Sequence, residues 1–149
     1  MANASTTGFG FRPIKMIGQA SNDAGLSEYK IAASSALISH GAMVQLTSDG
    51  VVLESANNTE ANLGVLNGIF FTDADTNKPT FANFSKASNT ATDIVAFVND
   101  DPRQMFEVMS ADTAFNQNEV GHCADQVKAD GVSPLFVSRS KISATTATT

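Results

Sequence analysis

Residues 41–71 constrain the fold of this chain more than any other stretch. Two short runs rich in apolar and β-branched residues, 43–47 and 51–53, flank the turn sequence Ser48-Asp49-Gly50. This arrangement is typical of a β-hairpin, because Asp-Gly supplies the positive φ that a tight turn needs. After a polar crossing, residues 63–71 form another apolar run, whose two glycines favour a bulged strand over a helix. We therefore predict that an antiparallel meander organises the chain.

A second hairpin is predicted further along the sequence. The apolar run 94–98 is followed by the turn residues 99–102, and the alternating run 105–109 then leads back. Pro102 ends the first run because proline has no N–H to donate to a neighbouring strand. Strand alternation predicts that four side chains of this hairpin are buried: Val95, Phe97, Phe106 and Val108.

The other segments complete a mainly β fold. Shorter strands are predicted at residues 28–32, 80–84 and 131–138, and one short helix is predicted within residues 111–118. We expect a small antiparallel β-barrel, tulip-like in shape, built from hairpins with short helical turns and an extended N-terminal arm.

The chain is predicted to contain a single domain between two less regular ends. Residues 1–22 form the extended arm, residues 23–140 form the β-rich domain, and residues 141–149 form a flexible tail. The tail prediction rests on a low-complexity sequence of Ser, Ala and Thr without hydrophobic periodicity.

The composition describes a folded, acidic protein. Hydrophobic residues make up 42% of the chain and charged residues 16%, whereas a disordered chain carries more charge and fewer apolar residues. The net charge is −6, but residues 1–22 carry Arg12 and Lys15 and no acidic residue, which leaves 7 basic and 15 acidic residues, or −8, for the rest. An acidic body argues against binding to nucleic acid through phosphate neutralisation.

Cysteine content and hydropathy indicate the redox compartment in which the chain folds and whether it contains a membrane span. A single cysteine cannot form an internal disulfide, which fits a reducing compartment. No run approaches the roughly 20 apolar residues that cross a bilayer. Residues 1–7 are small and polar, unlike the apolar core of a signal peptide. We expect a soluble, unprocessed protein without membrane association.

Residues 8–18 stand out as an apolar, basic segment near the N-terminus. They contain two Phe, two Ile and one Met among Gly and Pro residues that argue against a helix. Such a segment is either an edge strand of its own domain or an arm that lies on a partner protein. On the second interpretation, the partner-binding residues are Phe9, Phe11, Arg12, Ile14, Lys15 and Ile17.

The spacing Asp73-x-Asp75-x-Asn77 resembles the opening of a calcium-binding loop. That loop also needs Gly at its sixth position and Glu at its twelfth, where this chain has Lys78 and Phe84. We therefore interpret the segment as a polar turn.

Turn chemistry is also the preferred interpretation of the neighbouring acids Asp100 and Asp101. Consecutive turn residues point apart, and Arg103 supplies a counter-charge beside them.

His122 and Cys123 form the only His–Cys neighbourhood of the sequence, and His40 is the only other histidine. These residues cannot complete a structural zinc site, and neighbours on a strand point to opposite faces. We expect Cys123 to be buried and inert. No catalytic residue, metal ligand or cofactor site is predicted, so we do not expect an enzyme.

Several segments together resemble the head decoration, or cement, proteins of tailed bacteriophages, in their lambda-like group. The resemblance covers roughly residues 30–110 and rests on four stretches: Gly41-Ala42-Met43-Val44-Gln45-Leu46, Asp49-Gly50-Val51-Val52, Leu63-Gly64-Val65-Leu66-Asn67-Gly68 and residues 94–108. It implies a β-rich structural protein of the virion, usually a homotrimer, on the outer surface of the icosahedral capsid and assembled in the host cytoplasm. The implied partner is the major capsid protein, against which an N-terminal arm orders; the matching arm here is residues 8–18. Residues 111–149 lie beyond the resemblance.

Two other functions remain open. One is another structural component of the virion, such as a head fibre base, a neck protein or a minor coat protein. The other is a small β-barrel binding module or hydrolase. It requires a shared pocket built from His40, His122 and some of the residues Asp73, Asp75, Asp100 and Asp101.

Overall fold

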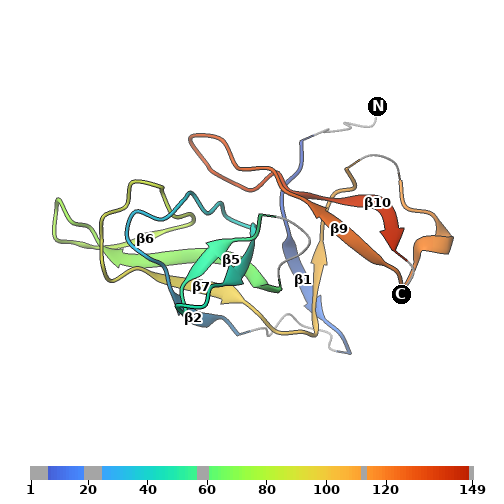
Figure 1. Ribbon diagram of the computed structural model, residues 1–149, viewed down its shortest axis with the longest axis horizontal. Coiled ribbons are helices and arrows are strands. Elements are labelled where there is room, and N and C mark those ends of the chain that lie inside the picture. Colours follow the sequence, from blue (N-terminus) through green and yellow to red (C-terminus); the bar gives the residue numbers. More distant parts are fainter. Residues whose placement is uncertain (1–6, 19–24, 57–60, 112–113, 148–149) are drawn as a thin grey trace.

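The computed structural model describes residues 7–18, 25–56, 61–111 and 114–147 (Figure 1). These residues form antiparallel β-sheets with almost no helix, so the predicted mainly β class is confirmed. The strands are β1 (Arg12–Met16), β2 (Ser27–Lys30), β3 (Met43–Leu46), β4 (Val52–Glu54), β5 (Asn62–Thr72), β6 (Pro79–Ala82), β7 (Val95–Asn99), β8 (Gln104–Glu107), β9 (Cys123–Val127) and β10 (Lys141–Ala147). In place of the helix predicted within 111–118, the described residues contain the 3-10 turn η1 (Gln117–Glu119).

The predicted hairpin lies in the largest sheet. β3 pairs antiparallel with β4, with Val44 opposite Glu54, and Gly50 adopts a φ of 73° in the turn. β5 pairs with the other edge of β3 and has a register shift between Leu66 and Gly68 where it pairs with β7. The bulged strand expected from the glycines is therefore confirmed.

The large sheet curls but does not close. Its strand order is β2-β7-β5-β3-β4, and β6 pairs with β5 outside this order. No ladder joins the outermost described strands β2 and β4, and a single isolated parallel bridge links Lys30 to Val51. The expected closed barrel is therefore not found in the described residues. The curled sheet surrounds the main core, whose fully buried members include Ile38, Val44, Val52, Leu66, Ile69, Ala96 and Val98.

The second predicted hairpin is wrong in its pairing. β8 follows β7 after a turn, but it pairs antiparallel with β1, with Pro13 opposite Phe106. β7 instead pairs with β2 and β5 inside the large sheet. The turn at 99–102 therefore carries the chain from one sheet to another.

The four side chains predicted to be buried in that hairpin, Val95, Phe97, Phe106 and Val108, are each only partly buried. On β7 it is the opposite face, with Ala96 and Val98 at 0% exposure, that lies against the core. On β7 the inward face was wrongly assigned to the larger side chains. On β8 the predicted face is the inward one, because Phe106 alternates with the exposed Met105 and Glu107 and packs on the buried Phe11.

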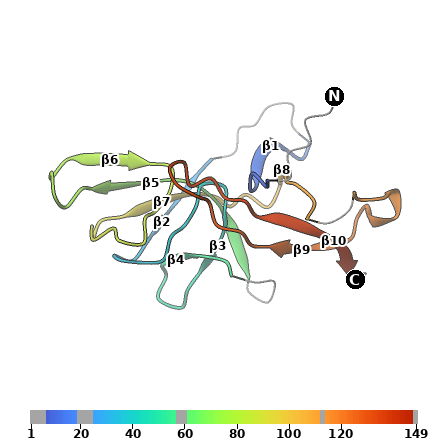
Figure 2. The ribbon, with the colours of Figure 1, turned by 90° about the horizontal axis from the view of Figure 1, so that it is seen from above.

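The C-terminal part also differs from the prediction. Residues 131–138 form a turn-rich loop whose Val137 makes one bridge to His40, and the last strand is β10, in the expected tail. β10 pairs antiparallel with β9, which places Lys141 opposite Val127. Cys123 is exposed on β9 and not buried as expected. Figures 1 and 2 show this ribbon at one end of the molecule and the β5–β6 hairpin at the other.

Candidate docking site on the β1–β8 ribbon

The predicted arm forms a strand of its own domain. β1 pairs with β8 through a ladder that is irregular between Pro13 and Lys15, because proline has no N–H to donate. Two further bonds hold the end of the strand. The Ile17 N–H donates to the Arg103 carbonyl oxygen at 2.8 Å, and the Gln104 side-chain amide donates to the Lys15 carbonyl oxygen at 3.1 Å. For residues 12–16, the structure therefore agrees with the first interpretation, a strand of the chain's own domain.

One face of the ribbon belongs to the protein interior. Phe11 is 5% exposed and Met16 is 4% exposed. The Phe11 ring meets the Phe106 ring edge to face, with 6.5 Å between the ring centroids. Phe11 was predicted as a partner-binding residue, but its burial makes it a core residue here.

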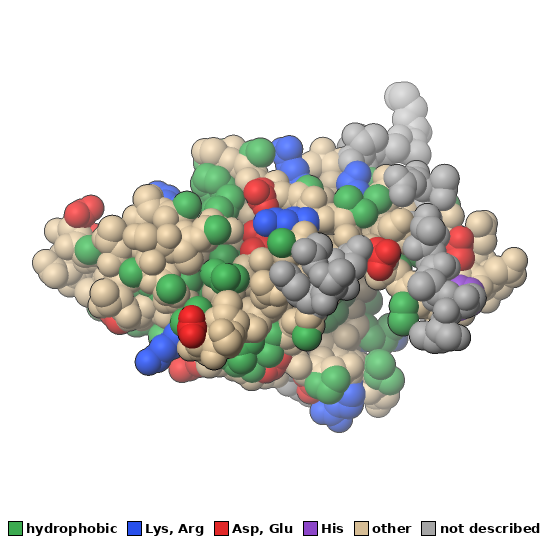
Figure 3. All heavy atoms as spheres, viewed as in Figure 1, with side chains coloured by type: hydrophobic (Ala, Val, Ile, Leu, Met, Phe, Trp, Pro, Cys, Tyr) green, Lys and Arg blue, Asp and Glu red, His purple; other side chains and the backbone are tan. Residues whose placement is uncertain are grey.

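The other face of the ribbon is apolar, basic and exposed. Ile14 is 46% exposed, Ile17 is 62% exposed, and Met105 of β8 is 38% exposed. Lys15 and Arg12 are exposed on the same strand, and the arginine forms a surface ion pair with Glu107 at 3.3 Å. Figure 3 shows basic and apolar side chains together where the lower end of β1 reaches the surface. We call Arg12, Ile14, Lys15, Ile17 and Met105 the ribbon face.

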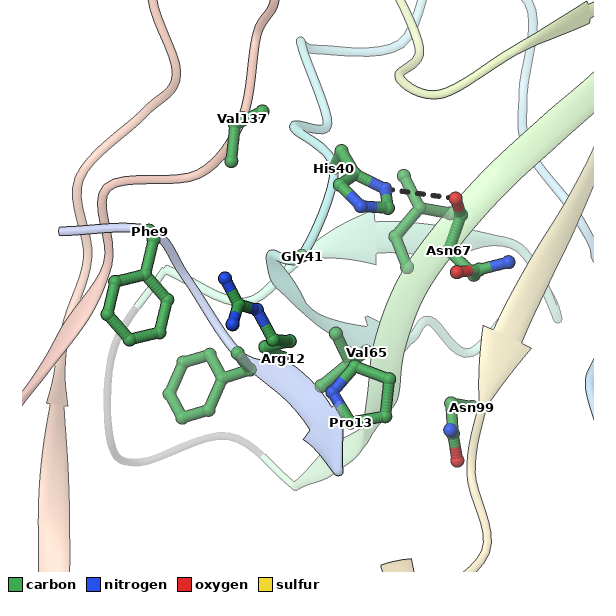
Figure 4. A pocket seen from close by; sticks show the side chains of 11 residues that line it. Phe9, Arg12, Pro13, His40, Gly41, Val65, Asn67, Asn99 and Val137 are labelled. Carbon is green, nitrogen blue, oxygen red and sulfur yellow. Dashed lines mark hydrogen bonds between the residues drawn. The ribbon is translucent and has the colours of Figure 1, made fainter. Parts of the chain in front are cut away.

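A cavity of about 250 Å³ lies between the start of β1 and the large sheet (Figure 4). The half-buried ring of Phe9 and the Arg12 guanidinium form one wall, with 5.5 Å between the guanidinium carbon and the ring centroid. Across the cavity, His40 Nδ1 lies 3.0 Å from the Asn67 carbonyl oxygen, which fixes the imidazole ring against β5. Five of the six predicted arm residues therefore lie at or near the surface, around this cavity or on the ribbon face.

The residues of the hydrolase alternative do not come together in any of three cavities of the described chain. His40 lines the cavity beside β1, whereas Asp73 and Asp75 line a cleft beside the β5–β6 hairpin. His122 is exposed after η1. Within the described part of the chain, no three His, Cys, Asp or Glu side chains are grouped so that they could hold a metal ion.

The acidic residues that were interpreted as turn residues serve local structure. Asp73 Oδ1 accepts hydrogen bonds from the Thr76 N–H at 2.8 Å and from the Thr76 hydroxyl at 3.0 Å, which lowers the pKa of Asp73. Asp101 accepts from the side chain and the backbone N–H of Arg103, and the pKa of Asp101 is lowered for that reason. The turn interpretation is confirmed for Asp73 and for Asp101.

Asp100 has a different role, because it joins two strands of the sheet. Its carboxylate accepts the Tyr29 hydroxyl at 2.6 Å and the Ser27 hydroxyl at 2.9 Å, both from β2. The hydrogen bond to this carboxylate raises the pKa of Tyr29.

Sequence reasoning did not single out Glu54, the most unusual ionisable group of the described chain. Its side chain is only 2% exposed, and neither carboxylate oxygen has a hydrogen-bond partner among the described residues. Burial raises the pKa of Glu54 from 4.5 to about 7, although Lys128, with Nζ 3.8 Å from Oε2, acts in the opposite direction. Lys128 also pairs with Asp130 at 3.4 Å. The pattern of β4 contained the signal, since Glu54 alternates with the buried Val52.

Comparison of the chain with protein-family models, with curated proteins and with solved structures returns no match. None of the helical structure described here is long and apolar enough to cross a membrane.

Proposed function

We propose that this chain is a structural protein of a phage virion that binds the outer surface of the icosahedral capsid and stabilises the shell. The observation that carries the proposal is the ribbon face, which exposes three large apolar side chains beside two basic residues on an otherwise acidic protein. Exposed apolar patches bordered by polar residues mark interaction surfaces.

The chemistry of the ribbon face indicates the kind of partner. Burial of Ile14, Ile17 and Met105 removes apolar surface from water, which is the main favourable term in protein association. Lys15 favours a surface that carries acidic groups, because charge complementarity guides the encounter and fixes the orientation, whereas the charge of Arg12 is already paired with Glu107. The proposed partner is therefore an apolar, acidic surface of the major capsid protein.

A capsid lattice suits a docking surface of this size. Three apolar side chains give a modest affinity for a single contact, but a homo-oligomer that binds several equivalent sites gains avidity. We propose a homotrimer as the oligomeric form, which light scattering on the purified protein tests directly.

Point substitutions on the ribbon face test the proposal better than removal of the arm. Deletion of residues 1–18 would also remove the buried Phe11 and Met16, so it would unfold the β1–β8 ribbon as well as remove the face. Ile14→Asp and Ile17→Asp change exposed positions only. Leu46→Asp is the matched control, because Leu46 is 45% exposed on β3, where Ile14 is 46% exposed on β1.

The experiment measures binding of each variant to capsids that lack the protein, by co-sedimentation, together with its copy number in purified particles. We expect Ile14→Asp and Ile17→Asp to weaken binding at least about tenfold while melting normally, and Leu46→Asp to bind like the wild type. A copy number equal to the major capsid protein, or a simple lattice fraction of it, supports decoration. A handful of copies instead indicates a neck or fibre position, and absence from particles refutes a virion role.

A further inference from the structure

A second cleft lies beside the β5–β6 hairpin, at the opposite end of the molecule from the β9–β10 ribbon (Figures 1 and 2). Its volume is about 440 Å³. Ile69 and Phe71 alternate on β5, and their partners across the ladder are Ala82 and Thr80 on β6. These four side chains line the cleft from one face of the strand pair, and Phe84 adds a second aromatic ring.

The rim of the cleft is polar and comes from two different loops. Asp75 belongs to the loop between β5 and β6, whereas Lys86, Ser88 and Thr90 belong to the segment that leads from β6 to β7. Within the described chain, these four side chains make no hydrogen bond or ion pair of their own. Asp73 differs, because its carboxylate is engaged by Thr76. The cleft therefore has one carboxylate, one ammonium and two hydroxyl groups with unused hydrogen-bonding capacity.

This set of groups favours a neutral ligand with many hydroxyl groups. The lining holds two carboxylates, of Asp73 and Asp75, and one ammonium, of Lys86, so an anion is not selected. Because the Asp73 carboxylate is engaged by Thr76, one carboxylate and one ammonium remain free to contact a ligand, and this pair suits a neutral hydroxyl-rich ligand better than a cation. A hydroxyl group can both donate to Asp75 and accept from Lys86, and it pairs equally well with the Ser88 and Thr90 hydroxyls. The apolar lining with two Phe rings suits the C–H face that a sugar ring presents on one side.

We propose that the cleft beside the β5–β6 hairpin binds a neutral oligosaccharide, with Asp75 and Lys86 as the main hydrogen-bonding residues. The size and composition agree with small-molecule sites, which have an apolar lining and a few polar groups that fix orientation. The inference does not depend on capsid binding. If both proposals hold, the β5–β6 end remains accessible while the ribbon face is covered.

The test is a titration of the isotope-labelled full chain with neutral disaccharides (lactose, maltose and chitobiose), followed by NMR. We expect at least one of them to shift the backbone amide signals of Phe71, Thr80 and Asn89, with saturation below about 10 mM, the range that reports a millimolar Kd. Asp75→Asn and Lys86→Ala should each weaken that Kd about tenfold, because each removes one charged hydrogen-bonding group at an exposed position. Ala74→Trp should abolish binding by filling the mouth of the cleft.

Controls keep the outcomes separate. Asp125→Asn and Lys30→Ala remove the same kinds of charge at exposed positions outside the cleft, and both should bind like the wild type. The proposal is overturned if no neutral disaccharide shifts the cleft signals, or if the shifts lie elsewhere. It is also overturned if binding survives Ala74→Trp, or if only a charged ligand such as sialyllactose or an acidic peptide binds.

Discussion

Replacement of the buried carboxyl of Glu54 by an amide, Glu54→Gln, should change how the stability of this protein depends on pH. Glu54 lies on β4 with 2% of its side chain exposed, and its pKa in the folded protein is about 7, against 4.5 for an ordinary glutamate. The folded state therefore holds a proton over a pH range in which the unfolded state has already lost it. The sign follows from proton linkage, because stability falls with rising pH wherever the folded state binds more protons.

The magnitude follows from the two pKa values. Below pH 4.5 the carboxyl is protonated in both states and the wild type has its full stability. Between pH 4.5 and 7 the free energy of unfolding falls by about 1.4 kcal/mol per pH unit, to a total loss of at most about 3 kcal/mol. Above pH 7 the loss stays constant. The attraction of Lys128 is already included in it, because that attraction lowers the pKa of Glu54.

Glu54→Gln removes the titrating group but keeps the shape of the side chain. The variant should lack this loss of stability between pH 4.5 and 7. At pH 8 it should exceed the wild type by at most about 3 kcal/mol, because the neutral amide avoids the net cost of burying the ionised carboxylate, a cost from which the attraction of Lys128 is already subtracted. Lys128 retains Asp130 as a partner at 3.4 Å.

Urea unfolding of both proteins at several pH values between 4 and 8 measures these differences. Asp125→Asn is the control, because it removes an exposed charge and leaves Glu54, Lys128 and Asp130 in place. Two results would refute the reasoning: a Glu54→Gln variant with the same pH slope as the wild type, or one that is about 3 kcal/mol less stable at pH 8. The second result would mean that the ionised pair with Lys128 stabilises the fold.

Two further substitutions examine other parts of the sheet. Gly64→Ala places a Cβ about 2.3 Å from the Asn99 carbonyl oxygen, so it should lower the free energy of unfolding, measured with urea, by about 1–3 kcal/mol. Gly25→Ala is the control, because it has open space around it and should not lower that free energy. Equal effects of the two substitutions would show that β5 and β7 are further apart. Tyr29 is the only tyrosine and the chain has no tryptophan, so ultraviolet titration reports this phenol alone. Asp100→Asn should lower the pKa of Tyr29 towards 10.0, and an unchanged titration would contradict the hydrogen bond that joins β2 to Asp100.

Local patterns predicted the elements of this fold better than their partners. The turn at Asp49-Gly50 contains its own chemical signal, and so does the bulge beside Gly68, which explains why both appear where the sequence placed them. The partner of β8 has no comparable signal. Both β1 and β7 are apolar strands with suitable alternation, and the choice depends on packing between Phe11 and Phe106, which lie far apart in sequence.

The C-terminal strand and the candidate site show two other limits. Residues 145–146 are threonines, which favour strands. A short polar run is equally typical of an irregular tail, however, and only the pairing with β9 distinguishes the two. Five of the six residues predicted for partner binding lie at or near the surface. Only Phe11 proved to be internal. The sequence could not tell which of the rings of Phe9 and Phe11 is buried, because the opposing strand decides it.

The pairing of β1 with β8 also sets an order on synthesis. Arg12 and Glu107 are separated by 95 positions, so β1 leaves the ribosome long before its neighbour exists. During that interval Phe11, Ile14, Met16 and Ile17 are without their final contacts, and an unpaired apolar strand is prone to join other chains. Closure of so long a loop is slow compared with formation of the β3–β4 hairpin. β1 is therefore secured later than the β3–β4 hairpin although it is synthesised before it, and its apolar side chains are open to aggregation in that interval.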